Sequence, residues 1–326
     1  MIQVLKDYFD KIKSSSSNQE IEYHIYNRED NSRMPFSVHL KFLDCSGIER
    51  NSWGSGLDKD SAFGKALMEM IERLYFTGFS PFEYKKLFPV FRKTCSLFQI
   101  ANDFDVAIKH FHPANTNGIA IHSSKKKALQ SALLELIERH VILSGLVLDI
   151  NPNYKIETEV AKDKWCTFYI WESPLKSYTV VGSYTDNSGT YFSSGCDFDK
   201  IEAIAKAEME LSSFLFLTEK ACTEFSIKKD DIQSFNRYHK YSGDHSAIRF
   251  LNNLSTKKIP ELNKDLFYFT NIPLPQIFQG LPILPAVRVI HPDVQQLFFD
   301  NWSKEYLNPR IFLKDQVLPS FPHIIA

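Results

Sequence analysis

Two pairs of glutamates are spaced so that a helix would present each pair on one face. Glu69 and Glu72 occur in SAFGKALMEMIERLYFTGF, and Glu135 and Glu138 occur in KKKALQSALLELIERHVILSGL. Residues three apart lie one helical turn from each other. Two like charges at that spacing repel, and a buried carboxylate without a partner is costly unless it becomes protonated. We therefore expect a cation between the acids.

Four carboxylates that share one site would suit magnesium. Oxygen ligands are the ligands that Mg²⁺ prefers, and each ion usually takes only one or two carboxylates plus water and substrate phosphates. Four acids therefore indicate more than one ion. The natural ligand of such a site is a nucleoside triphosphate, whose negative charge and phosphoryl transfer the metals assist.

Three other interpretations compete with this one. The glutamates can form ordinary ion pairs with Arg73 and Arg139, which follow each Glu-x-x-Glu directly. A di-iron bundle needs Glu-x-x-His, but here the third position is Glu, and His140 stands five residues after Glu135. Paired glycosidase carboxylates normally come from separate strand ends, so two tandem helical pairs support that class poorly.

The motif is repeated along the chain, which makes chance a weaker explanation than for one Glu-x-x-Glu. The shared order is Ala, Ala, Glu, Glu, Arg with the same internal spacing: Ala62, Ala66, Glu69, Glu72, Arg73 and Ala128, Ala132, Glu135, Glu138, Arg139. A weaker third copy keeps Ala203, Ala207 and Glu210 but has Ser213 in place of the second acid. The repeat predicts duplicated strand-plus-helix units.

The elements that position the acids follow from the pattern. Apolar residues at three- and four-residue steps predict a buried helix over Lys125–Leu146 and a similar one over Ser61–Phe79. Trp53–Gly56 and Ala114–Gly118 are predicted to be turns that lead into these helices. Such turns can place backbone N–H groups near phosphate. Lys127 lies two turns before Glu135 and can reach a phosphate, although a solvated first turn of the helix is the better-supported explanation.

The remaining elements predict an α+β (mixed α/β) fold with mainly antiparallel sheets and duplicated strand–helix units. Alternating or β-branched segments predict strands at 21–26, 36–42, 165–171, 178–184, 191–196, 267–270 and 284–290. We expect one domain over residues 1–326, with an N-terminal helix and mobile loop over 1–19 and a proline-bearing tail over 310–326.

Composition restricts the class of protein. The 326 residues carry a formal net charge of −1, which argues against nucleic acid as a partner. Five scattered cysteines form no Cys-x-x-Cys pair, so neither a disulfide framework nor a structural zinc site is expected. No apolar run is long enough for a membrane span, and the first residues do not resemble a signal peptide. A cytoplasmic protein is expected.

Taken together, the motifs resemble the YcaO family of ATP-dependent peptide-modifying enzymes. Three segments carry the resemblance in the family's order, and PAVRVIHPDVQQLFF follows them: SWGSGLDKDSAFGKALMEMIER, NTNGIAIHSSKKKALQSALLELIERH and SGCDFDKIEAIAKAEMELSS. The resemblance implies a YcaO-like domain that binds ATP with Mg²⁺. It implies a cyclodehydratase, which turns Cys, Ser or Thr of a ribosomally made precursor peptide into azolines by phosphorylating the backbone amide oxygen.

The resemblance also implies which residues form the site. The metal ligands would be the four acids Glu69, Glu72, Glu135 and Glu138. The nucleotide would be contacted by Ser55, Arg73, Asn117, Lys127, Arg139 and Lys229. No proton acceptor is evident in the motifs, and the family suggests the terminal carboxylate of Ala326.

Several positions depart from the family pattern. Ser55 stands where many members have Lys, Ala62 where they have Ser, Lys127 where Glu is common, and Lys229-Asp230-Asp231 where an Arg-Asp-Asp segment is found. The acidic cluster is intact, so a divergent bacteriocin-type synthetase subunit fits best. The alternatives are a degenerate, non-catalytic scaffold or substrate-binding subunit, and a member that makes thioamides or amidines.

The expected partners follow from the same family. They are the precursor peptide, a separate leader-peptide-binding protein and, for azole formation, a flavin-dependent dehydrogenase. A homodimer is left open.

Overall fold

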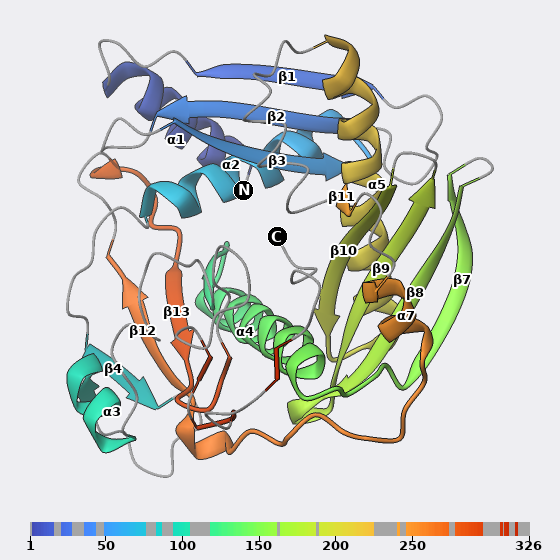
Figure 1. Ribbon diagram of the computed structural model, residues 1–326. Helices are drawn as coiled ribbons and strands as arrows, with labels where there is room; N and C mark the ends of the chain where they lie inside the picture. Colours follow the sequence, from blue (N-terminus) through green and yellow to red (C-terminus); the bar gives the residue numbers. More distant parts are fainter. Residues whose placement is uncertain are drawn as a thin grey trace. The chain divides into compact units, whose positions relative to one another are not determined.

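Figure 1 shows the computed structural model of the chain with its helices and strands. The described residues are 2–15, 21–27, 36–43, 49–75, 83–86, 94–104, 118–161, 164–186, 189–224, 240–241, 246–273, 278–295, 307–308, 310–312 and 317–318. Every strand pair among them is antiparallel. The predicted α+β class with antiparallel sheets is therefore confirmed.

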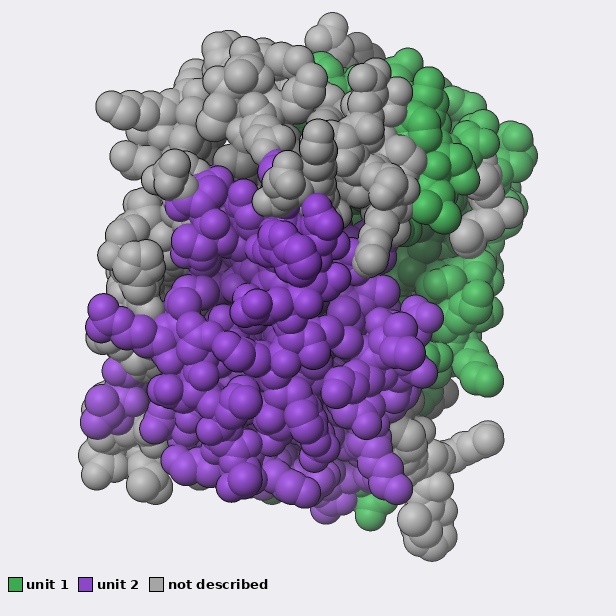
Figure 2. All heavy atoms as spheres, turned by 90° about the vertical axis from the view of Figure 1, so that its right-hand side faces the viewer, with its two compact units in different colours: residues 1–135, 265–292 green, residues 136–264, 293–326 purple. Residues whose placement is uncertain are grey.

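The chain divides into two compact units (Figure 2). The first comprises residues 1–135 and 265–292, and the second comprises residues 136–264 and 293–326. Helix α4 (Lys125–Val147) contributes its residues up to Glu135 to the first unit and the rest to the second. Whether the whole chain folds as one domain stays a prediction.

A three-stranded sheet forms one part of the first unit. Its order is β1 (Glu22–Asn27), β2 (Phe36–Leu43) and β3 (Glu49–Gly56), and helices α1 (Ile2–Ser15) and α2 (Lys59–Tyr75) pack with it. The inward side chains of β2 meet apolar residues of both helices: Leu5, Tyr8, Val38, Leu40, Phe42, Ala62, Ala66 and Met70. This core fixes α2 against β2 and β3, so the sheet sets where the α2 glutamates lie.

The first unit also contains a five-stranded sheet. Its order is β5 (Thr94–Ser96), β4 (Glu83–Lys86), β12 (Tyr268–Ile272), β13 (Ala286–Ile290) and β6 (Ile119–Ile121). Helix α3 (Leu97–Asp103) follows β5, and a single 3₁₀ turn (Lys264–Leu266) spans the boundary between the two units just before β12. Strand β6 leads directly into α4, the helix predicted over Lys125–Leu146.

The second unit is built on another five-stranded sheet. Its order is β11 (Lys240–Tyr241), β10 (Gly189–Asp197), β9 (Ser177–Asp186), β8 (Lys164–Ser173) and β7 (Tyr154–Ala161). A 3₁₀ turn (Pro174–Lys176) joins β8 to β9. Helix α5 (Lys200–Glu224) covers one face, where its alanines pack against strand residues: Cys166, Phe168, Ile170, Val180, Tyr191, Ala203 and Ala207.

The opposite face of this sheet is also covered. The hydroxyl of Tyr169 donates to Asn252 of helix α7 (Ser246–Asn252) at 3.2 Å, and the indole of Trp171 donates to the carbonyl of Ile150 at 2.9 Å. Both aromatic side chains are almost completely buried. The sheet is therefore buried on two faces, which fixes the register of β8, β9 and β10.

The predicted duplication appears as repeated local geometry. A strand leads into a helix whose N-cap carbonyl accepts the N–H of the first repeated alanine: Asp58 with Ala62, Ser124 with Ala128, and Asp199 with Ala203. The carboxylates of Asp58 and Asp199 also accept N–H groups of the first helical turn, at 2.6 and 2.7 Å. These caps are the reason the three helices begin where they do.

The segment Trp53–Gly56 is not a turn, contrary to our prediction from its glycines. It is the end of strand β3. Gly54 is required because a Cβ there would overlap the carbonyl oxygen of Ala62 and the backbone nitrogen of Ala66. The glycine thus permits close packing of strand on helix, a recognised use of glycine inside a strand.

Candidate functional site

Glu69 on α2 is held by the protein at both carboxylate oxygens. Its Oε2 accepts the backbone N–H of Trp53 at 2.7 Å. Its Oε1 accepts the Nη2 of Arg73 at 2.6 Å and the Nε of the same guanidinium at 3.2 Å. The ion-pair alternative considered for the sequence is therefore correct for Glu69 and Arg73. Glu69 is fixed in orientation, with part of its hydrogen-bonding capacity already used.

Glu72, one turn further along α2, is in a different electrostatic situation. Its pKa is raised well above the ordinary value, chiefly because the carboxyl is removed from water, and then because of the neighbouring charges of Glu135 and Glu69. Arg73 opposes the shift but does not cancel it. The structure thus brings three of the four predicted acids of α2 and α4 within electrostatic reach, and a cation there would relieve their repulsion.

Glu138 lies in the second unit, one helical turn after Glu135 on α4. Its Oε1 accepts a hydrogen bond from the hydroxyl of Ser194 on β10 at 2.7 Å. The backbone N–H of Ser194 donates to Oε2 of Glu210 on α5 at 3.0 Å. Ser194 was not a predicted site residue. It is 56 residues from Glu138 in sequence, so no local pattern could have revealed the contact.

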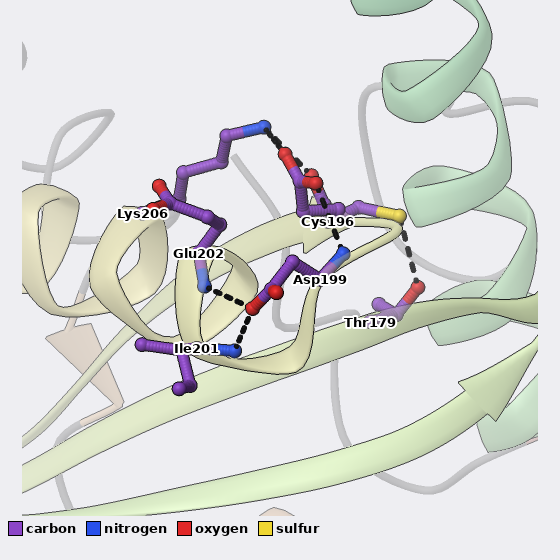
Figure 3. Close-up of polar contacts among 7 residues, drawn as sticks. Thr179, Cys196, Asp199, Ile201, Glu202 and Lys206 are labelled. Atoms are coloured by element: carbon purple, nitrogen blue, oxygen red, sulfur yellow. Dashed lines mark hydrogen bonds and ion pairs between the residues drawn. The ribbon is translucent and has the colours of Figure 1, made fainter.

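The copies β3–α2 and β10–α5 share more than the alanines. In each copy, the strand residue just before the glycine donates its backbone N–H to the first glutamate of the helix motif. Trp53 donates to Glu69, and Ser194 donates to Glu210. In the second of these copies, Lys206 also reaches back to the carbonyl of Cys196 at 3.0 Å, and Asp199 caps the helix (Figure 3). Glu210 is thus the structural counterpart of Glu69, as the spacing predicted.

The carboxylates are the ligand type that magnesium prefers, but their side chains are not positioned around a common point. Oxygen donors are the correct ligand type, and burial and the neighbouring acids disfavour the charged form of Glu72, which a bound cation would stabilise. Among the residues that the structure describes, however, no group of three or more His, Cys, Asp or Glu side chains is arranged to hold a metal ion. The donor set fits the ion, and the side chains would have to adjust around it.

The family model for YcaO cyclodehydratases, described as ATP- and Mg²⁺-binding, matches residues 83–272, which is more than half of the chain. The chain belongs to the YcaO family. The matched range contains the Glu135–Glu138 motif of α4 and the whole of β10, and it begins after the α2 motif. Membership therefore makes ATP and Mg²⁺ the cofactors of the family to which this chain belongs.

Solved structures share the fold. One is the YcaO protein from Methanopyrus kandleri bound with AMPPCP and Mg²⁺, at 14% identity, with a TM-score of 0.59 over 89% of this chain and 89% of that one. Another is a heterocyclase in complex with substrate and cofactor, at 13% identity and a TM-score of 0.59 over 90% of this chain. The match spans 52%, about half, of that heterocyclase. No curated protein matches the sequence.

Among the residues predicted to contact the nucleotide, Arg139 has a buried donor that could bind a phosphate. It follows Glu138 directly on α4 and is partly buried. Its Nε is buried and has no hydrogen-bond partner within the described ranges. Orphaned buried donors are rare in folded proteins, and a phosphate oxygen would satisfy this one. Arg73, in contrast, already binds Glu69.

The other nucleotide-binding residues predicted for this YcaO chain are less informative. Ser55 is buried near the end of β3, where its hydroxyl lies 2.9 Å from that of Ser37. Lys127 is exposed in the first turn of α4. Asn117, Lys229 and the terminal carboxylate of Ala326 lie outside the described residues. Their roles stay predictions.

No helix among the residues described here is long and apolar enough to cross a membrane.

Proposed function

We propose that this chain is an ATP- and Mg²⁺-dependent cyclodehydratase subunit that makes azolines in a ribosomally synthesised precursor peptide. The observation that carries the proposal is the closeness of Glu72 to Glu69 and Glu135, because a bound cation would stabilise the charged form of these neighbouring acids. Membership of the YcaO family supports the nucleotide and the metal. The proposal that the product is an azoline rests on the resemblance of the motifs to those of YcaO cyclodehydratases.

The reaction balances without another co-reactant. A Cys, Ser or Thr side chain of the peptide adds to the preceding backbone carbonyl carbon and loses its proton. The oxygen of the resulting adduct takes the γ-phosphoryl group of ATP, which leaves ADP. Loss of that oxygen as phosphate, together with the amide proton, gives the C=N bond of the azoline.

The chain's own residues bind and orient the reactants. The Mg²⁺ ligands would be Glu72, Glu135 and Glu138. Glu69 would add only the lone pairs that its hydrogen bonds from Arg73 and Trp53 leave unused. When bound, Mg²⁺ neutralises charge on the phosphates and lowers the barrier to their transfer. Arg139 would donate its free Nε to a phosphate oxygen. Glu135, Glu138 and Arg139 lie on consecutive turns of α4, so α4 supplies most of the proposed ligands.

The test is phosphate release by the purified chain with precursor peptide and the leader-binding partner. We expect release that depends on peptide and Mg²⁺, and a peptide mass lower by about one water for each ring. Glu138→Gln should abolish both signals. Glu202→Gln, an exposed acid of α5 that is outside the cluster, is the matched control and should behave as wild type.

A second candidate, a non-catalytic scaffold of such a synthetase, is favoured by one observation. Both oxygens of Glu69 are already used by protein donors, as in an ordinary structural ion pair. If the purified chain binds no nucleotide with any peptide or partner, the scaffold is correct. If phosphate is released but the peptide gains sulfur or closes an amidine ring, the site is correct and the azoline is wrong.

A further inference from the structure

Ser194 uses two separate donors on two carboxylates. Its backbone N–H binds Glu210 of α5, and its hydroxyl binds Glu138 of α4. A carboxylate is only an acceptor, so the hydroxyl must be the donor to Glu138. Ser194 is 9% exposed, which limits competition from water for this hydrogen bond. One residue of β10 thus links the acids of two helices.

Comparison with the copy β3–α2 shows which of the two hydrogen bonds of Ser194 is a shared structural feature. Trp53 occupies the place of Ser194 and also gives its N–H to a helix glutamate, Glu69. Its side chain stacks on His39 instead, with ring centroids 3.7 Å apart. The N–H bond is therefore common to both strand–helix copies, whereas the hydroxyl bond to Glu138 is particular to β10.

The hydroxyl bond has a specific consequence for Glu138. A glutamate side chain rotates about three bonds, and a partly exposed one samples several orientations. A hydrogen bond at Oε1 fixes the orientation of the carboxylate. No residue of the described ranges donates to Oε2, which would then face another ligand. Outer donors of this kind orient carboxylates that bind metals, and their loss typically weakens metal binding by about 10- to 100-fold.

We propose that Ser194 is a positioning residue that orients Glu138 for the cation accompanying the nucleotide phosphates. This inference rests on the proposed function. It also explains the third copy of the repeat, in which Ser213 replaces the second acid: β10–α5 supports the acid of α4 in place of supplying a second one of its own.

The test is to measure the affinity of the chain for Mn²⁺ by electron paramagnetic resonance, with a non-hydrolysable ATP analogue present. Ser194→Ala should weaken Mn²⁺ binding about tenfold. Ser194→Thr keeps the hydroxyl and should restore most of the affinity. The matched control is Ser193→Ala, which removes the adjacent buried hydroxyl that donates to the carbonyl of Ala207 at 2.7 Å. This control should leave Mn²⁺ affinity unchanged. In the phosphate-release assay, added Mg²⁺ should rescue Ser194→Ala.

The outcomes separate the two proposals. If the wild type binds Mn²⁺ and Ser194→Ala binds it equally well, the positioning role is wrong and the proposed function stands. Equal weakening by Ser193→Ala and Ser194→Ala would mean a merely structural role and would also overturn the inference. If the wild type itself binds no Mn²⁺ with the nucleotide analogue, the proposed function fails first. Should Ser194→Ala not fold, Ser194→Cys keeps the volume with a weak donor and should show reduced affinity.

Discussion

The copies β3–α2 and β10–α5 have the same skeleton but different acids. Both place a glycine against two helix alanines, both cap the helix with an aspartate, and both bind a strand N–H with a glutamate. They diverge one turn later, where α2 has Glu72 and α5 has Ser213. The shared features are therefore explained by packing alone, and the candidate chemistry lies in what differs.

This comparison changes how the motif is interpreted. Glu69 and Glu210 have a structural use that would exist without any ligand. Within the described part of the chain Glu72 makes no such hydrogen bond, and its charged form is disfavoured by burial and by neighbouring acids. Natural proteins keep such local conflicts mainly at functional sites. The second acid of the Glu-x-x-Glu pair is thus the better marker of function.

The largest expected effect comes from breaking the shared skeleton. Gly54→Ala should lower the free energy of unfolding by about 3 kcal/mol or more, because its Cβ would overlap backbone atoms of α2. Gly195→Ala should act in the same direction but less, since the nearest backbone atoms would lie 2.7 Å away. Urea unfolding of the metal-free protein measures both.

Gly64→Ala is the control for these substitutions. Its Cβ would make only an ordinary contact, 3.6 Å from Leu5, and a helix interior favours alanine. We expect no loss of stability. If Gly54→Ala and Gly195→Ala were as harmless as Gly64→Ala, the two copies would not share a close-packed strand and helix.

A second difference between the copies predicts different acid sensitivity. Burial lowers the pKa of His39, beside Trp53, from 6.5 to about 4. The unfolded chain therefore binds a proton at His39 more readily than the folded one. The stabilising contribution of neutral His39 is complete above pH 6.5 and is lost as pH falls toward 4, by about 3 kcal/mol in total.

His39→Phe tests this assignment because it keeps a ring against Trp53 and removes the titration. Acid unfolding followed by hydrogen exchange should begin in β2 and β3 in the wild type and shift to lower pH in the variant. An unchanged acid transition in His39→Phe would show that other groups control the first unit at low pH.

A smaller effect is expected from the glutamates that bind strand N–H groups. Glu210→Ala should cost about 1 to 2 kcal/mol in the metal-free protein, because the N–H of Ser194 loses a charged acceptor. Glu69→Ala should cost a similar amount through Trp53. Chemical denaturation measures both, with Glu202→Ala as the exposed control. A cost near zero for one copy only would mean that the two bonds are not equivalent.

The smallest effect concerns the ion pair of Lys206 with Asp197, whose atoms lie 2.6 Å apart. The lysine side chain is 42% exposed, so solvent screens the pair, and Lys206→Met should cost about 1 kcal/mol or less. Gly56 stands in the first copy where Asp197 stands in the second, so this ion pair is not shared by the two copies. Thermal melting of the wild type and of Lys206→Met at low and high salt tests this prediction, since the variant should lose the salt dependence that the pair contributes.

The sequence predicts the helices better than the strands. Helices α2, α4 and α5 were found because apolar residues recur at helical steps and because the alanines and glutamates repeat. Strand β7 was not predicted, since it is an edge strand whose side chains are mostly exposed and mix charged with apolar residues. The glycines at the end of β3 were taken for a turn, because their packing role depends on a helix that the local pattern does not place.

The site shows the same limit. The closeness of Glu72 and Glu135 was predicted from the repeat, because the two copies of the motif were expected to supply acids to one shared site. The pairing of Glu69 with Arg73 was an open alternative, since residues four apart on a helix can always meet. The contact of Ser194 with Glu138 depends on where a distant strand passes α4, and it needed the structure.

The central claim is that the second acids of α2 and α4 hold Mg²⁺ against ATP. Calorimetric titration of the purified chain with a non-hydrolysable ATP analogue, with and without Mg²⁺, tests it most directly. The account predicts Mg²⁺-dependent binding that is lost in both Glu72→Gln and Glu138→Gln and retained in Glu202→Gln. Equal binding by the wild type and by the Glu72→Gln/Glu138→Gln double variant would contradict it.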